Sequence, residues 1–125
     1  MKNNVLLVEE NDEIRANIAK CLSLEGYDVT EADCGAKAVL LASGELPSLI
    51  VCDVLMRCMD GYAVFLSLFK TIYFHKIPFI YFTVDGKTQS ADVLSIENYP
   101  SRRFLEPGLL NYVKKIIPVD NRIAS

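Results

Sequence analysis

The sequence has little of what metal clusters, nucleic-acid surfaces and membrane spans require. Its four cysteines form no C-x-x-C motif, and no histidine stands at metal-ligand spacing from any of them, which argues against a zinc site. Its 13 Lys and Arg residues are scattered among 16 Asp and Glu residues, so no basic stripe for nucleic acid is present. The first apolar run has only four residues, too few for a signal peptide or a membrane span. We therefore expect a cytoplasmic protein without direct nucleic-acid or membrane contacts.

Length and composition indicate one folded domain. The chain has 125 residues, of which 51% are hydrophobic and 23% are charged, a mixture typical of compact globular proteins. No internal repeat, low-complexity stretch or linker divides it. We expect the domain to span residues 1–118, with 119–125 as a C-terminal tail or the start of a linker.

Short apolar runs alternate with stretches of helical periodicity along the chain. The continuous runs predict buried strands, and apolar residues spaced three and four apart predict helices between them. Strands are expected at 5–8, 27–32, 49–52, 79–82 and 104–105, and helices at about 14–22, 36–42, 64–69, 90–97 and 109–117. Asn11 or Asp12 is available to cap the first helix, and Pro107 is suited to open the last. This alternation predicts an α/β fold: a doubly wound parallel sheet of five strands in a three-layer sandwich.

Polar residues follow four of the expected strands, at the point where each strand ends. Glu9 and Glu10 follow the first strand, Asp53 the third, Thr83 the fourth and Glu106 the fifth. Ligands of such sheets bind beyond the carboxyl ends of the strands, so these side chains are expected to share one crevice. The first loop contains no glycine, which argues against a dinucleotide site, and a flavin-phosphate loop rich in Ser, Thr and Gly is missing too.

Several carboxylates at one edge of a sheet repel one another and are costly to bury unpaired. A hard divalent cation resolves the repulsion, and Mg²⁺ is the first candidate. A carboxylate beside Mg²⁺ in a shallow cleft can also act as a nucleophile toward a phosphoryl group. The alternative is that each acid is a solvated loop residue, but the convergence of the whole set on one crevice favours a site.

Four segments of the chain together resemble the receiver domains of two-component response regulators. They are Val8-Glu9-Glu10-Asn11, Asp53-Val54-Leu55-Met56 running on to Met59-Asp60-Gly61, Phe82-Thr83, and Phe104-Leu105-Glu106-Pro107. Their spacing is that of the family, and the resemblance extends from about Asn4 to Ile117. It implies a flavodoxin-like receiver fold with the strand order 2-1-3-4-5.

The resemblance also implies a role for each residue of the site. Asp53 would accept a phosphoryl group from a sensor histidine kinase or a phosphotransfer protein, with no enzymatic activity beyond self-phosphorylation and autodephosphorylation. Glu10, Asp53 and the Leu55 carbonyl would hold Mg²⁺, with Glu9 assisting through water. Thr83 would bind the phosphoryl group and shift the conformation that a downstream effector protein or a fused output domain reads.

Five positions depart from the family pattern. Glu106 stands where the family has a lysine, which reverses a charge beside the phosphoryl group unless the side chain turns to solvent. Glu10 replaces an aspartate, and the extra methylene is expected to weaken Mg²⁺ binding. Arg103 stands where an aromatic switch residue is usual, Arg57 replaces a proline, and Val84 replaces a small residue.

Two functional hypotheses stay open on the sequence. The first is a working receiver that is phosphorylated on Asp53 with Mg²⁺. The second is a pseudo-receiver, a protein-interaction or dimerisation module that acts without phosphorylation, as the departures suggest. The aromatic stretch from Phe65 to Phe74 fits either core packing, which we favour, or the surface of a homodimer.

Overall fold

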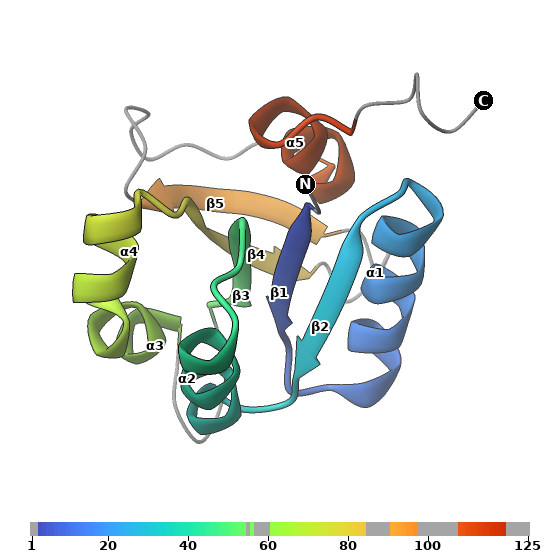
Figure 1. The fold of residues 1–125 in the computed structure, drawn as a ribbon. Helices are drawn as coiled ribbons and strands as arrows, with labels where there is room; N and C mark the ends of the chain where they lie inside the picture. Colours follow the sequence, from blue (N-terminus) through green and yellow to red (C-terminus); the bar gives the residue numbers. More distant parts are fainter. Residues whose placement is uncertain (1–2, 55, 57–60, 85–90, 98–107, 120–125) are drawn as a thin grey trace.

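A computed structural model of the chain describes residues 3–54, 56, 61–84, 91–97 and 108–119 (Figure 1). The strands are β1 (Asn4–Val8), β2 (Asp28–Ala32), β3 (Leu49–Asp53), β4 (Phe79–Val84) and β5 (Ala91–Glu97). The helices are α1 (Asp12–Leu24), α2 (Gly35–Gly44), α3 (Gly61–Ser67), α4 (Phe69–His75) and α5 (Leu109–Ile116). Within the described ranges, no helix has the length and apolar character needed to cross a membrane.

The five strands form one sheet in the order β2-β1-β3-β4-β5. The four strands from β2 to β4 pair in parallel. The apolar runs predict this for β1, β3 and β4, which bury most of their side chains, whereas the edge strand β2 buries only Ala32. Val8 of β1 stands opposite Cys52 of β3, and Asp53 stands opposite Phe82 of β4. The carboxyl ends of β1, β3 and β4 therefore lie side by side.

The edge strand β5 differs from the expectation. A helix was expected at 90–97, but Ala91–Glu97 is a strand that pairs antiparallel with β4, with a register shift opposite Tyr81 and Phe82. Helical periodicity is weak in this stretch, and the outer edge of β4 exposes backbone groups that a neighbouring strand satisfies. The helix prediction is wrong for this tertiary reason. The strand expected at 104–105 lies outside the described residues, so the structure confirms the predicted order for the first four strands and places the unexpected antiparallel β5 beside β4.

Two apolar layers pack on the two faces of the sheet, which confirms the three-layer sandwich. On one face, α2, α3 and α4 pack their buried residues against strand residues Leu6, Val8, Ile50, Cys52, Phe79 and Tyr81. On the other face, α1 and α5 pack against Val5, Leu7, Leu49, Val51, Ile80 and Phe82. Figure 1 shows α2, α3 and α4 grouped on one side of the sheet. Alternate residues of each strand thus enter alternate layers.

The helix expected after Gly61 is divided in two at Leu68. The Leu68 N–H donates to both Val64 O, at 3.1 Å, and Phe65 O, at 3.2 Å, which tightens the chain where α3 ends. Leu68 is itself buried, and α4 begins at the next residue. The predicted periodicity was correct, because Val64 and Leu68 face the core on both sides of the break.

The first helix begins where one of the two candidate caps predicts. Asn11 has an extended backbone, and its side-chain Oδ1 accepts a hydrogen bond from the Ile14 N–H at 2.9 Å. The helix ends before Gly26, whose φ of 103° is a left-handed conformation that favours glycine. The Asn11 cap thus fixes the start of α1 next to the carboxyl end of β1.

Candidate functional site

A cavity of about 330 Å³ opens at the carboxyl edge of the sheet, between β1, β3 and β4. Its lining residues are Glu9, Glu10, Asn11, Ile14, Asp53, Thr83 and Val84. Four of the six residues predicted for the site, Glu9, Glu10, Asp53 and Thr83, are thus brought together. The other two, Leu55 and Glu106, lie outside the described residues, as do Arg57 and Arg103.

Glu9 is the charged residue that the fold buries most deeply at this edge, with only 3% of its surface exposed. Its backbone N–H donates to Ala32 O at 3.0 Å, which extends the β1–β2 pairing by one residue. One carboxyl oxygen, Oε2, accepts the Asn11 N–H at 2.8 Å. The other, Oε1, is buried and finds no hydrogen-bond donor among the described residues. An unsatisfied carboxylate oxygen is costly to bury and marks a place for a proton or a cation.

The neighbour of the Glu9 carboxyl is the carboxyl of Asp53. The pKa of Glu9 is raised to about 7, first by burial and also by the neighbouring Asp53 carboxyl, against the opposing effect of the Asn11 N–H. A proton or a metal ion between the two carboxyls would relieve their repulsion.

The residues of this pair fit a magnesium ion in part. Among the described residues, no group of three or more His, Cys, Asp or Glu side chains lies close enough to hold a metal. Mg²⁺ is commonly bound through one or two carboxylates together with water, and the neighbouring carboxyls of Glu9 and Asp53 offer such a pair. The sequence suggested Glu10 as the direct ligand and Glu9 as the water-mediated one. The structure buries Glu9 beside Asp53 and leaves Glu10 half-buried.

Thr83 and Val84 form the wall of the cavity contributed by β4. The Val54 N–H donates to Phe82 O at 3.0 Å, which continues the β3–β4 pairing just past Asp53. Thr83 is half-buried and follows Phe82, the residue that pairs with Asp53. Val84 also packs against the apolar layer beneath α1 and α5. Val84 thus belongs both to the core and to the lining of the cavity.

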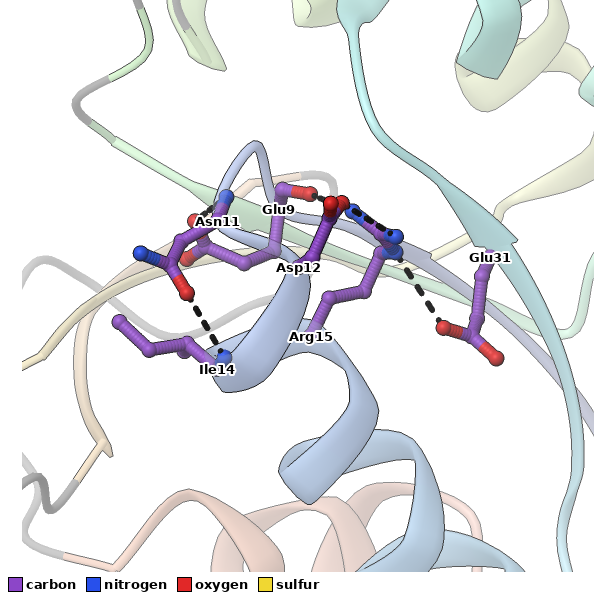
Figure 2. Close-up of polar contacts among 6 residues, drawn as sticks. All are labelled: Glu9, Asn11, Asp12, Ile14, Arg15 and Glu31. Carbon is purple, nitrogen blue, oxygen red and sulfur yellow. Dashed lines mark hydrogen bonds and ion pairs between the residues drawn. The ribbon is translucent and has the colours of Figure 1, made fainter.

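Sequence analysis missed the cluster of polar contacts around Arg15, shown in Figure 2. Arg15 contacts the backbone of Glu9 and the carboxylates of Asp12 and Glu31. Burial lowers the pKa of its guanidinium, but the two acids outweigh burial and leave the pKa raised. The i,i+3 spacing of Asp12 and Arg15 was a visible signal for one contact. The other two depend on how β2 and the end of β1 lie relative to α1.

The sequence matches the response regulator receiver domain family over residues 5–120. The chain belongs to this family. The match agrees with the parallel α/β sheet, its strand order and the acids at its carboxyl edge. The flavodoxin-like receiver fold expected from the four segments is therefore confirmed.

Curated relatives of this receiver include two probable transcriptional regulators. The chain is 36% identical over 86 residues to the probable transcriptional regulator ycf27 of Pyropia yezoensis, covering 69% of this chain and 34% of that protein. It is 30% identical over 124 residues to the probable transcriptional regulator ycf29 of Porphyra purpurea, covering 97% of this chain and 59% of that protein. The chain thus spans between a third and three fifths of the length of these relatives.

Solved structures of receivers share the fold. The chemotaxis protein CheY4 of Vibrio cholerae superposes with a TM-score of 0.62 at 25% identity, covering 70% of this chain and 73% of that chain. The receiver domain of a signal transduction histidine kinase from Syntrophus aciditrophicus gives a TM-score of 0.59 at 31% identity, covering 69% of this chain and 65% of that chain. Both similarities are to receiver domains of two-component signalling proteins.

Proposed function

We propose that this receiver accepts a phosphoryl group on Asp53 in the presence of Mg²⁺ and signals through the resulting change of conformation. The supporting observation is the buried pair of Glu9 and Asp53, in which Glu9 Oε1 has no donor among the described residues. The pair lies in an open cavity next to a threonine hydroxyl. A buried acid that needs a cation beside a nucleophilic carboxylate suits phosphoryl transfer.

The proposed transfer uses few protein groups. A carboxylate oxygen of Asp53 forms a bond to phosphorus while the bond from phosphorus to the donor histidine nitrogen breaks, and that nitrogen takes up a proton. Bound Mg²⁺ would neutralise the phosphoryl oxygens. Glu9, Glu10 and the Leu55 carbonyl would hold it together with Asp53, and the Thr83 hydroxyl would donate a hydrogen bond to the phosphoryl group.

Glu106 sets this receiver apart from its family, because it brings a negative charge where a lysine is usual. Two charges about 4 Å apart interact by roughly 4 kcal/mol at an effective dielectric near 20. A Glu106 side chain facing the phosphoryl group would therefore slow transfer, and one facing solvent would not. Glu106→Lys is the direct way to measure the effect.

The proposed partners follow from the family. A sensor histidine kinase or a phosphotransfer protein would donate the phosphoryl group, in the cytoplasm, and a downstream effector protein or a fused output domain would read the switch. The names of these two relatives point to transcription as the output of those proteins. The alternative of a phosphorylation-independent module gains no support from the comparisons.

Phosphorylation of the purified protein with a small acyl phosphate and Mg²⁺ tests the proposal. Intact-mass measurement should show the gain of one phosphoryl group, and both Asp53→Asn and removal of Mg²⁺ by a chelator should abolish it. Asp28→Asn is the matched control, because Asp28 is exposed at the opposite end of β2. Absence of phosphorylation from both the small donor and a partner kinase would overturn the proposal, as would equal phosphorylation of Asp53→Asn.

A further inference from the structure

The guanidinium of Arg15 joins three separate segments next to the proposed phosphorylation site (Figure 2). One terminal nitrogen, NH1, donates to the backbone oxygen of Glu9 at 3.0 Å, and the other, NH2, donates to Asp12 Oδ1 at 2.8 Å. Nε donates to Glu31 Oε1 at 3.2 Å. The end of β1, the first turn of α1 and the carboxyl end of β2 are thereby tied to one side chain.

These contacts require the shape of an arginine. A guanidinium presents five N–H donors in a rigid plane, so three acceptors in different directions can be bound at once. A lysine ammonium on the same stem is a point charge that would reach the acids more readily than a third acceptor. The Arg15 side chain is 16% exposed, so its hydrogen bonds are partly shielded from competition by water.

The contact of Arg15 that bears most directly on the site is its hydrogen bond to the backbone carbonyl of Glu9. Glu9 is bound at three other points: its N–H to Ala32 O, its Oε2 to the Asn11 N–H, and its carboxyl against Asp53. Arg15 adds a fourth contact, to the backbone carbonyl of Glu9. Residues that orient a metal ligand in this way commonly change metal affinity by 10-fold to 100-fold when removed, roughly.

We propose that Arg15 is a positioning residue, which holds Glu9 so that its carboxyl stays beside Asp53 and receives the metal ion. The inference deepens the proposed function and rests on it for the identity of the ion. Asp12 and Glu31 act through Arg15, because they bind guanidinium nitrogens other than the one that binds Glu9. A residue at the end of β2 thereby acts on the site between β1 and β3.

Two measurements on Arg15→Met test the inference, since Met keeps an apolar stem and loses the guanidinium. The first is the Mg²⁺ affinity of the unphosphorylated protein, obtained from amide chemical shifts during titration with Mg²⁺ alone; we expect it to fall about tenfold. The second is hydrogen exchange of the Asn11 amide without metal, which we expect to accelerate because that amide is bound to Glu9. Lys20→Met is the matched control, since it removes one exposed charge from the same helix.

Two further variants separate positioning from overall stability. Arg15→Lys keeps the charge and is expected to restore only part of the Mg²⁺ affinity, while Glu31→Gln should weaken it less than Arg15→Met. The urea-induced unfolding free energy of each variant is measured alongside, so that affinities are compared only for folded protein.

The outcomes of these measurements distinguish failure of the inference from failure of the proposed function. Equal Mg²⁺ affinity in Arg15→Met and Lys20→Met would overturn the inference and leave the proposed function intact, whether or not Asn11 exchange differs. Full rescue by Arg15→Lys would overturn it as well, since a charge alone would then suffice. If the unmodified protein neither binds Mg²⁺ nor takes up a phosphoryl group, the proposed function fails, and the inference fails with it if Asn11 exchange is also unchanged in Arg15→Met.

Discussion

Two regions of this receiver differ in which side chains they bury and which they expose. The acidic corner, formed by Glu9, Asn11, Arg15 and Asp53, places the Glu9 carboxyl inside the fold, where hydrogen bonds of 2.8 to 3.0 Å hold Glu9 and its carbonyl. The aromatic face, formed by Tyr62, Leu66, Phe69, Tyr73 and Phe74 on α3 and α4, places large apolar groups outside, with Phe74 79% exposed. The first arrangement costs free energy unless every polar group is satisfied, while the second is tolerated without partners.

The aromatic face also differs in charge from the rest of the chain. No Asp or Glu occurs from Gly61 to Val84, although the chain as a whole has a net charge of −3. Phe69 and Tyr73 stack at 6.1 Å between ring centroids, so these exposed rings cover one another in part. Beneath them, Phe65 packs edge-on against Phe79 at 5.4 Å. The favoured expectation of core packing thus holds for Phe65, which packs against the apolar layer, while Tyr73 and Phe74 are exposed.

The largest expected effect is the difference in stability between replacing a buried ring, Phe79, and replacing an exposed ring, Phe74. Phe79 is fully buried and contacts both Phe65 and Tyr81, so Phe79→Ala leaves a cavity and should lower the unfolding free energy by about 3 to 5 kcal/mol. Phe74→Ala removes a ring of the same size from the aromatic face and should change it by less than about 0.5 kcal/mol. Urea unfolding of both variants measures the contrast, and similar losses would show that the exposed rings are packed in solution.

An intermediate loss of stability is expected at Gly61, where α3 lies against the backbone of Asp53. A Cβ at this position would lie 2.9 Å from the backbone oxygen of Asp53 and 3.0 Å from the Tyr81 ring. Gly61→Ala should therefore push on the Asp53 backbone and cost about 1 to 3 kcal/mol of unfolding free energy. It should also slow phosphorylation of Asp53, because the nucleophile is displaced.

The matched control for this variant is Gly44→Ala, at the end of α2. A Cβ there meets no atom within 4 Å, so the variant should be neutral or slightly stabilising. If Gly61→Ala proved as stable and as readily phosphorylated as Gly44→Ala, α3 would not restrain Asp53.

The smallest expected effect is a pH-dependent change in stability that arises from Glu9. Its pKa of about 7 in the fold, raised by burial above the ordinary 4.5, means that the folded state prefers the protonated acid. The stabilisation from this protonation is complete below pH 4.5 and is lost as pH rises through about 7. Glu9→Gln, which stays neutral, should therefore gain stability over the unmodified protein by about 1 to 2 kcal/mol at pH 8 and by much less at pH 5.

The control and the metal sharpen this measurement. Glu13→Gln, an exposed acid in the first turn of α1, should show no such pH dependence. Mg²⁺ should reduce the advantage of Glu9→Gln at pH 8, because a metal ion bound to the carboxylate stabilises the unmodified fold. An advantage that is the same at pH 5 and pH 8 would mean that Glu9 is ionised throughout.

The sequence by itself determined the parallel strands, a cap at Asn11 or Asp12 and the meeting of Glu9, Asp53 and Thr83 at one edge. These features depend on local patterns, since an apolar run, a capping side chain and a strand end are each encoded by neighbouring residues. The tertiary structure decided the rest: the antiparallel edge strand at Ala91–Glu97, the burial of Glu9 rather than Glu10, and the contacts of Arg15 with β2. Each of these depends on which distant backbone or acid lies opposite, because hydrogen bonds between elements are set by their packing and not by the order of residues along the chain.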